Sequence, residues 1–197
     1  MKALNDMSLE ELWELFPIVL KEYNPAYKSW YAEESENLAA ALSGHGICRM
    51  SHIGSTSVEG LIAKPIVDIL LELTDDYDVN AIVGLLQSTG WILMAQNKLK
   101  KTLDFNKGYT PSGFAEKVYH LHVKPSGDWD ELYFRDYLIG HFDAARQYEA
   151  LKLRLLEQFE NNRDAYTNAK SQFVLNCTQK AREELNGRYL PTRTSPK

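Results

Sequence analysis

The sequence has few cysteines and no long apolar run. Its two cysteines, Cys48 and Cys177, lie far apart and do not form the closely spaced pairs that bind zinc. No run of about 18 apolar residues occurs, and the opening MKALNDMSLEEL lacks the apolar segment of a secretion signal. We therefore expect a cytoplasmic protein with reduced thiols, no membrane segment and, at 197 residues, a core large enough to fold without disulfides.

An excess of positive charge is also missing. The chain carries 22 lysine and arginine residues against 27 aspartate and glutamate residues, which gives a net charge of −5. A protein that captures nucleic acid over a broad surface needs that surface to be basic, so nucleic acid is not an expected partner. Internal repeats and low-complexity segments are missing too, which favours an ordinary globular protein.

Hydrophobic periodicity predicts helices at both ends of the chain and strands between them. A capping box at Ser8 and Glu11 begins the first helix, which should reach Leu20 with a kink or break at Pro17. Further helices are expected over 28–43, 78–88, 130–142, 143–160 and 163–186, and strands over 47–53, 66–73, 91–96, 101–106 and 117–124. The segment NKGYTPSGFAE should be a loop between the last two strands.

This order of elements predicts an α+β protein, with a mixed β-sheet flanked by helices and a helical C-terminal third. We expect one domain over 1–197, with N-terminal helices at 1–45, a sheet core at 46–126, a helical part at 127–186 and a frayed tail at 187–197. The strand at 66–73 should be internal to the sheet, because apolar residues occupy both of its faces.

The stretch SHIGSTSVEGLIAKPIVDILLE combines a strand end with a glycine–serine turn. Gly54 lets the backbone approach a ligand closely, and the hydroxyls of Ser55 and Thr56 can add donors to the backbone amides of the Gly54–Ser57 turn. Such a turn can bind phosphate, although the same pattern also occurs in turns that bind nothing.

Asp68 interrupts the apolar strand that follows this turn. An ionised carboxylate in a strand buried on both faces costs several kcal/mol unless it is paired or bound to a cation. Lys64 precedes Pro65, which favours an extended backbone and fixes where the lysine leaves the chain. Lys64 could pair with Asp68 or reach a phosphate as a point charge, and either role places it at the same cleft.

Two histidines could add metal ligands. His120 and His122 lie on one face of a predicted strand, about 6.6 Å apart, and Asp68 could complete a site for Zn²⁺, Mn²⁺ or Fe²⁺. The alternative is that both rings pack on the strand face and bond to neighbours. His52, just before the turn, is a weaker third candidate.

Basic side chains of the C-terminal helices could complete an anion site. Tyr148 with Lys152 and Tyr166 with Lys170 are i,i+4 pairs, so each pair shares one helix face. If these faces turn toward the sheet, Arg135, Lys152 and Lys170 supply a cationic wall for a triphosphate. Otherwise each lysine is exposed and simply covers a tyrosine ring.

Several of these segments together resemble the GrpB family, which is related to the polymerase-beta-type nucleotidyltransferases. They are HIGSTSVEGLIAKPIVDI, YHLHV, FRDYL and the two Tyr-x-x-x-Lys segments, and the resemblance runs from Trp13 to Phe173. It implies a nucleotidyltransferase-like sheet, with Ser55 and Thr56 on the phosphate side and Asp68 as a ligand of Mg²⁺ or Mn²⁺.

The chain departs from the nucleotidyltransferase pattern at Leu70. That superfamily has a second carboxylate two residues after the first, and Glu72 is too distant to replace it, about 13 Å along the strand from Asp68. The departure weakens the expectation of catalysis more than that of nucleotide binding.

We therefore expect a protein that binds a nucleotide or another phosphorylated small molecule, and that acts as a metal-dependent nucleotidyl or phosphoryl transferase with Asp68 and Lys64 as catalytic residues. One alternative is a non-catalytic module for a nucleotide or a CoA-like ligand. Another is a metal-dependent hydrolase or isomerase built on Asp68, His120 and His122.

Overall fold

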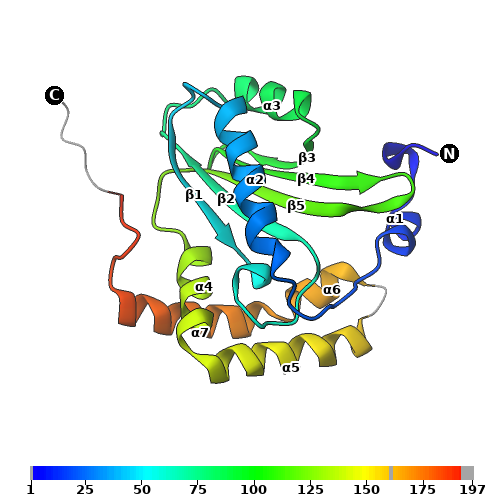
Figure 1. Ribbon diagram of the computed structural model, residues 1–197, viewed down its shortest axis with the longest axis vertical. Coiled ribbons are helices and arrows are strands. Elements are labelled where there is room, and N and C mark those ends of the chain that lie inside the picture. The colour runs from blue at the N-terminus through cyan, green and yellow to red at the C-terminus, as the bar shows by residue number, and fades with distance from the viewer. Residues whose placement is uncertain (1, 160–161, 192–197) are drawn as a thin grey trace.

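The computed structural model describes residues 2–159 and 162–191 and forms a five-stranded mixed sheet with helices on both faces (Figure 1). The helices are α1 (Leu9–Leu15), α2 (Ala26–Ala41), α3 (Val79–Ser88), α4 (Asp130–Gly140), α5 (Phe142–Gln158), α6 (Arg163–Asn168) and α7 (Ser171–Leu185), and the strands are β1 (Ile47–Ile53), β2 (Val67–Leu73), β3 (Ile92–Asn97), β4 (Thr102–Thr110) and β5 (Gly113–Pro125). The strand order is β1-β2-β5-β4-β3, with β2 and β5 parallel and the other pairs antiparallel. The predicted α+β class and single mixed sheet are confirmed.

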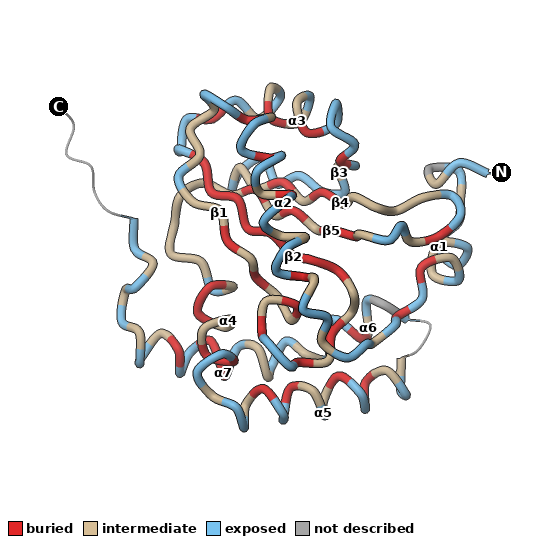
Figure 2. The backbone as a smooth tube through the Cα atoms, viewed as in Figure 1, coloured by how far each residue is buried: buried red, intermediate tan, exposed pale blue. Residues whose placement is uncertain are grey.

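Strand β2 is internal, as predicted, and its two faces differ. Val67, Ile69 and Leu71 face a core that also contains residues of α2 and α3, and this core is the red centre of Figure 2. The opposite face carries Asp68, Leu70 and Glu72 by the two-residue period of a strand. This face of β2, on which Asp68 and Glu72 flank Leu70, meets the helices that follow β5.

The C-terminal helices cover the face of the sheet that carries Asp68. Leu132 of α4 packs against Leu70 and Ile53, and α5 contacts α7 through the stacked rings of Tyr148 and Phe173, 5.3 Å apart. Figure 1 shows α4, α5 and α7 gathered below the sheet while α2 crosses its other face. The prediction that the helices after residue 130 pack beside the sheet is confirmed.

The first helix and the predicted loop before β5 are corrected by the structure. Helix α1 ends at Leu15, and the chain beyond Pro17 is extended, with Lys21 forming a bridge to Ala63. The segment NKGYTPSGFAE is a β-hairpin, because β4 and β5 continue to a turn at 111–112. Gly108 sits in a bulge at φ +88°, where a side chain would collide with the backbone of β5, and this explains a glycine within the strand.

The described C-terminal residues also differ from the prediction in two places. The expected helix 163–186 is divided into α6 and α7 by a turn at Ala169 and Lys170. In the expected tail, the hydroxyl of Tyr189 bonds to Asp136 and Arg135, so residues 187–191 are held against α4, while 192–197 lie outside the described residues. None of the helices in the described ranges is both long and apolar enough to cross a bilayer.

Candidate functional site

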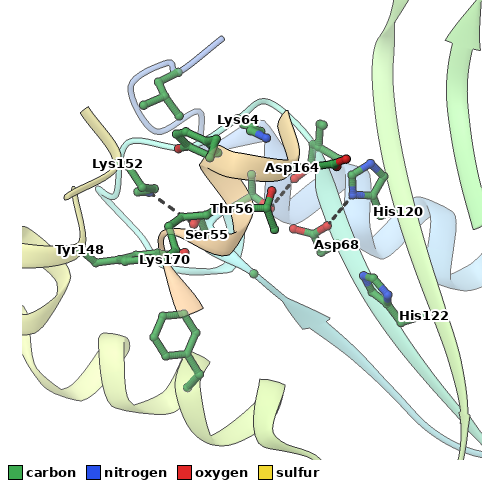
Figure 3. Close-up of a pocket in the computed structure, with 16 residues that line it drawn as sticks. Ser55, Thr56, Lys64, Asp68, His120, His122, Tyr148, Lys152, Asp164 and Lys170 are labelled. Carbon is green, nitrogen blue, oxygen red and sulfur yellow. Dashed lines mark hydrogen bonds and ion pairs between the residues drawn. The ribbon is translucent and has the colours of Figure 1, made fainter. Parts of the chain in front are cut away.

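A cavity of about 390 Å³ lies between the Asp68 face of the sheet and the helices α5 and α6 (Figure 3). It brings together nine of the residues that the sequence singled out. They are Gly54, Ser55, Thr56, Lys64, Asp68, His120, His122, Lys152 and Lys170. In Figure 3 the lysines Lys152 and Lys170 approach from the helical side, whereas Asp68 and the two histidines lie on the sheet side.

Position 54 requires a glycine, because its backbone conformation and the nearby Asp68 leave no room for a side chain. Its backbone has φ +70° and ψ −173°, a region essentially restricted to glycine. A Cβ atom built on Gly54 would lie 2.2 Å from Oδ2 of Asp68, so any side chain would displace the carboxylate. Ser57 closes the turn by donating from Oγ to the carbonyl oxygen of Gly54 at 2.6 Å, and it lies outside the cavity lining.

The Thr56 hydroxyl is already used within the protein. It donates to the carbonyl oxygen of Ile66 at 3.0 Å and lies 3.0 Å from Nε2 of His52. Because the hydroxyl has a single proton, His52 must be the donor in the second bond. The hydroxyl thus joins the turn to the start of β2, and its predicted part in phosphate binding stays a prediction.

His52 is part of the same structural contact and does not line the cavity. Its ring stacks on Tyr31 at 5.0 Å, and burial lowers its pKa to about 4. The imidazole is therefore neutral at physiological pH, which is consistent with its role as the donor to Thr56.

Asp68 faces the cavity with a quarter of its side chain exposed, and its Oδ1 bonds to Nδ1 of His120 at 3.0 Å. Burial raises the pKa of Asp68, but the His120 hydrogen bond and the charges of His120 and His122 outweigh it and lower the pKa below the ordinary value. Asp68 is therefore an ionised carboxylate at neutral pH, directed at the cavity.

The two histidines of β5 have different partners. Nε2 of His120 bonds to the Tyr109 hydroxyl at 2.8 Å, so both nitrogens of this ring are occupied. Nδ1 of His122 bonds to Asp104 on β4 at 2.7 Å. No group of three or more His, Cys, Asp or Glu side chains placed to hold a metal occurs within the described ranges. This geometry does not fit a metal centre made of Asp68, His120 and His122 alone.

Lys152 and Lys170 are two cations of the cavity whose pKa values are lowered by burial. Lys152 is 2% exposed, donates to the carbonyl of Ile62, and lies 3.4 Å from Oγ of Ser55. Burial and the nearby charge of Lys170 lower the pKa of Lys152 to about 7. Burial lowers the pKa of Lys170 to about 8, although Asp68 acts in the opposite direction.

The tyrosines of the two i,i+4 pairs contact their lysines as the helix spacing predicts. Nζ of Lys152 lies 4.9 Å from the ring centre of Tyr148, and Nζ of Lys170 lies 4.4 Å from that of Tyr166. Lys64 approaches the same Tyr166 ring at 4.7 Å. The lysines therefore cover the tyrosine rings and also line the cavity, and Lys152 is buried rather than exposed.

Arg135 is not brought into this site. Its guanidinium donates to the carbonyl oxygen of His52 at 3.1 Å, to Asp136 at 2.8 Å and to the Tyr189 hydroxyl at 2.8 Å. Of the predicted cationic wall, Lys152 and Lys170 line the cavity together with Lys64, whereas Arg135 joins α4 to β1 and the C-terminal segment.

Three residues of the site region were missed from the sequence. Asp164 lines the cavity from α6, Asp104 orients His122, and Tyr109 bonds to His120. Asp104 alternates with the apolar residues Leu103 and Phe105, which marks a polar strand face, but the sequence does not reveal which strand lies next to β4. Tyr109 fell in the segment that was predicted to be a loop.

Comparison with known proteins identifies the family. The GrpB protein family matches residues 17–180. The chain belongs to the GrpB family. Over 161 residues it is 30% identical to the Glutamate-rich protein GrpB of Alkalihalophilus pseudofirmus, covering 80% of this chain and 91% of that protein. The crystal structure of conserved protein GrpB from Enterococcus faecalis matches with a TM-score of 0.72 at 26% identity, covering 84% of this chain and 98% of that one.

Two further relatives of this GrpB chain are longer than the matched segment. The chain is 37% identical over 152 residues to a UPF0157 protein of Pseudomonas aeruginosa, covering 77% of this chain and 62% of the relative. It is 28% identical over 169 residues to the UPF0157 protein YqkA of Bacillus subtilis, covering 84% and 48%. The chain therefore spans less than two thirds of the length of these two relatives.

Proposed function

We propose that this GrpB protein binds the phosphate groups of a nucleotide in the cavity, and that it transfers a nucleotidyl or phosphoryl group with Asp68 and Lys64 at the reacting end. The observation that carries the proposal is the convergence of three lysines from separate parts of the chain. Lys64 precedes β2, Lys152 lies on α5, and Lys170 lies between α6 and α7. A volume of about 390 Å³ suits a small-molecule ligand.

The charge state of the lysines supports a polyanionic ligand. Burial makes Lys152 and Lys170 easier to deprotonate, which means that the protein alone does not compensate their charge. Among the described residues, the ammonium group of Lys170 has no hydrogen-bond or ion-pair partner, and its contact is with the Tyr166 ring. A bound phosphate would supply the missing negative charge and would bring both lysines back to the protonated form.

A divalent ion fits this site in company with phosphate. Mg²⁺ is commonly held by one or two carboxylates together with phosphate oxygens and water. Asp68 offers one such carboxylate, and Mg²⁺ or Mn²⁺ bound there would neutralise charge on the transferring phosphate. We therefore expect metal binding that depends on nucleotide.

Calorimetric titration with ATP, other nucleoside triphosphates and CoA, each with and without Mg²⁺ or Mn²⁺, tests the proposal. Lys170→Met keeps the aliphatic stem and removes the charge, so we expect it to lower nucleotide affinity about 10-fold or more. Lys28→Met removes an exposed lysine that pairs with Glu59 and serves as the matched control. Equal affinities in the wild type and Lys170→Met would contradict the proposal.

The second candidate is a non-catalytic module that binds a nucleotide or a CoA derivative. It is favoured by Leu70, which packs against Ile53 and Leu132 where a transferase of this type would have its second carboxylate. Nucleotide binding without any turnover in Mg²⁺ or Mn²⁺ would select this alternative. A hydrolase or isomerase built on a metal at Asp68, His120 and His122 receives no support, because both nitrogens of His120 are already bonded.

A further inference from the structure

A carboxylate–imidazole pair at the edge of the cavity has no part in the phosphate binding described above. Asp104 on β4 and His122 on β5 face each other directly in the antiparallel register of these strands. Oδ1 of Asp104 lies 2.7 Å from Nδ1 of His122. The backbones of two paired strands thus fix both members of the pair before any ligand binds.

His122 differs from its neighbour His120 in having one nitrogen available. His120 is bonded through both nitrogens, to Asp68 and to Tyr109. Nε2 of His122 has no hydrogen-bond partner among residues 2–159 and 162–191, and the side chain lines the cavity. His122 is therefore the histidine of this strand that can exchange a proton with a bound ligand.

Asp104 determines which nitrogen of His122 can exchange a proton with a ligand. A carboxylate that accepts the Nδ1 proton leaves the lone pair of the neutral ring on Nε2. Burial lowers the pKa of His122, but the hydrogen bond that the ring donates to Asp104 and the negative charges of Asp68 on β2 and Glu131 on α4 outweigh it and raise the pKa. The ring therefore changes its protonation state at a higher pH than an ordinary histidine.

The position of the pair relative to β2 supports a part in the chemistry. His122 is paired in register with Leu70 across the parallel β2–β5 ladder. Leu70 occupies the place where the resemblance to nucleotidyltransferases implies a second acidic residue. A polar group that β2 itself lacks is thus supplied by the adjacent strand, on the same side of the sheet as Asp68.

We propose that His122, oriented by Asp104, is the acid–base group of the transfer reaction, an inference that rests on the function proposed above. The oxygen of an acceptor hydroxyl forms a bond to phosphorus, and the bond from phosphorus to the leaving phosphate oxygen breaks. The leaving group takes that electron pair, and Nε2 of neutral His122 takes the proton of the attacking hydroxyl. Asp104 stabilises the resulting imidazolium.

The test measures the hydrolysis of ATP by the whole protein with Mn²⁺ between pH 5.5 and 9, with water as the acceptor. In the wild type we expect the rate to rise with pH as His122 loses its proton. His122→Asn or His122→Gln should remove this inflection and lower the rate about 100-fold or more, while ATP affinity measured by calorimetry stays within about threefold. Asp104→Asn should move the inflection to lower pH, which a purely structural role would not do.

The chain contains a matched control for this pair. His141 and Glu184 form another histidine–carboxylate contact, at 3.4 Å, with both side chains well exposed. Glu184→Gln should leave rate, inflection and affinity unchanged. Wild-type hydrolysis rates and inflection in both His122 variants would overturn the inference alone. ATP bound but intact at every pH would overturn the inference together with the transfer step of the proposed function, and would select the non-catalytic module. Failure of the wild type to bind ATP would overturn the proposed function as well.

Discussion

Asp68 and Glu72 lie on the same face of β2, and their surroundings differ completely. Glu72 is fully buried and receives both arms of the Arg49 guanidinium, one of them at 2.8 Å, together with the backbone amide of Gly127 at 3.0 Å. Asp68 is partly exposed, bonds to His120, and opens onto a cavity that contains three lysines. Glu72 is thus surrounded by partners within the protein, whereas Asp68 faces the cavity.

The difference shows how a buried carboxylate in an apolar strand can be interpreted. A buried carboxylate needs an opposite charge or hydrogen-bond donors nearby. If the protein supplies them, the carboxylate has a structural role, and if a ligand must supply them, its role is functional. At Glu72 the compensation is built into the fold through Arg49 and Gly127. At Asp68 the surrounding charges are themselves incompletely compensated, since burial lowers the pKa of Lys152 and Lys170.

Removing the Glu72 carboxylate should have the largest effect. Glu72→Ala leaves the Arg49 guanidinium and the Gly127 amide without their acceptor, and we expect the free energy of unfolding to fall by about 3–5 kcal/mol. Urea denaturation followed by circular dichroism measures the loss. Glu59→Gln, which breaks the exposed pair with Lys28, is the control and should cause no measurable change. A loss below about 1 kcal/mol for Glu72→Ala would show that Glu72 is not the structural carboxylate that sets it apart from Asp68.

Replacing Lys64 in the cavity should lower nucleotide affinity more than it lowers the stability of the fold. Lys64→Ala should weaken nucleotide binding by about 1.5–3 kcal/mol, because a charged contact to phosphate is lost, and Ser55→Ala should weaken it less. Calorimetry on the folded variants measures both. Lys117→Ala, which loses the ion pair with Glu33, provides the control. Unchanged affinity in both site variants would place the ligand elsewhere.

A side chain at Gly54 should disturb the same end of the strand. Gly54→Ala combines unfavourable backbone geometry at φ +70° with a collision against Asp68, so we expect about 2 kcal/mol of destabilisation. Gly44→Ala also places a side chain at positive φ but meets no atom within 4 Å, so it measures the cost of a positive φ without a collision. Equal melting temperatures for the two variants would show that the Asp68 contact at Gly54 is unimportant.

The stability of the ligand-free protein should depend on pH through Lys152 and Lys170. Their folded-state pKa values, about 7 and about 8, lie below the unfolded value of about 10.4, so the unfolded chain binds more protons between these limits. The free energy of unfolding should therefore rise from pH 7 to pH 9, with a slope of roughly 1–2 kcal/mol per pH unit. The double variant Lys152→Met/Lys170→Met should flatten the curve. The same slope in wild type and variant would contradict the assignment.

Asp68→Asn should have the smallest effect on stability. The amide oxygen can still accept the proton of His120, and a partly buried charge is removed, so we expect a change within about 1 kcal/mol. Nucleotide-dependent binding of Mn²⁺ should fall sharply in the same variant. Melting curves in EDTA and in Mn²⁺ with ATP measure both effects. A large stability loss in EDTA with an unchanged response to Mn²⁺ would make Asp68 a structural residue like Glu72.

Local sequence patterns predicted the elements that depend on near neighbours. The capping box at Ser8 and Glu11 forms as expected, and Asp78 caps α3. The strand at 47–53 has the predicted bounds, and 66–73 differs by one residue. These features follow from side-chain period and from hydrogen bonds between residues a few positions apart, which the sequence shows directly.

Turn-forming residues within strands misled the same reasoning. Glycine, proline and serine in NKGYTPSGFAE indicated a loop, yet the bulge at Gly108 lets β4 and β5 remain paired up to the turn at 111–112. The break between α6 and α7 was missed because helical periodicity continues through it. In both cases packing against other parts of the chain decided the outcome.

Local patterns in the sequence were thus sufficient to predict the α+β class, the internal strand that Asp68 interrupts, and the candidate residues around the Gly54 turn. The tertiary structure alone decided which of those residues meet. It brought Lys152 to Ser55, directed Arg135 to His52 and Tyr189, and paired His122 with Asp104 on a strand whose position no local pattern reveals. The physical reason is that period and capping act over a few residues, whereas compensation of a buried charge depends on groups that only the folded chain brings within hydrogen-bonding distance.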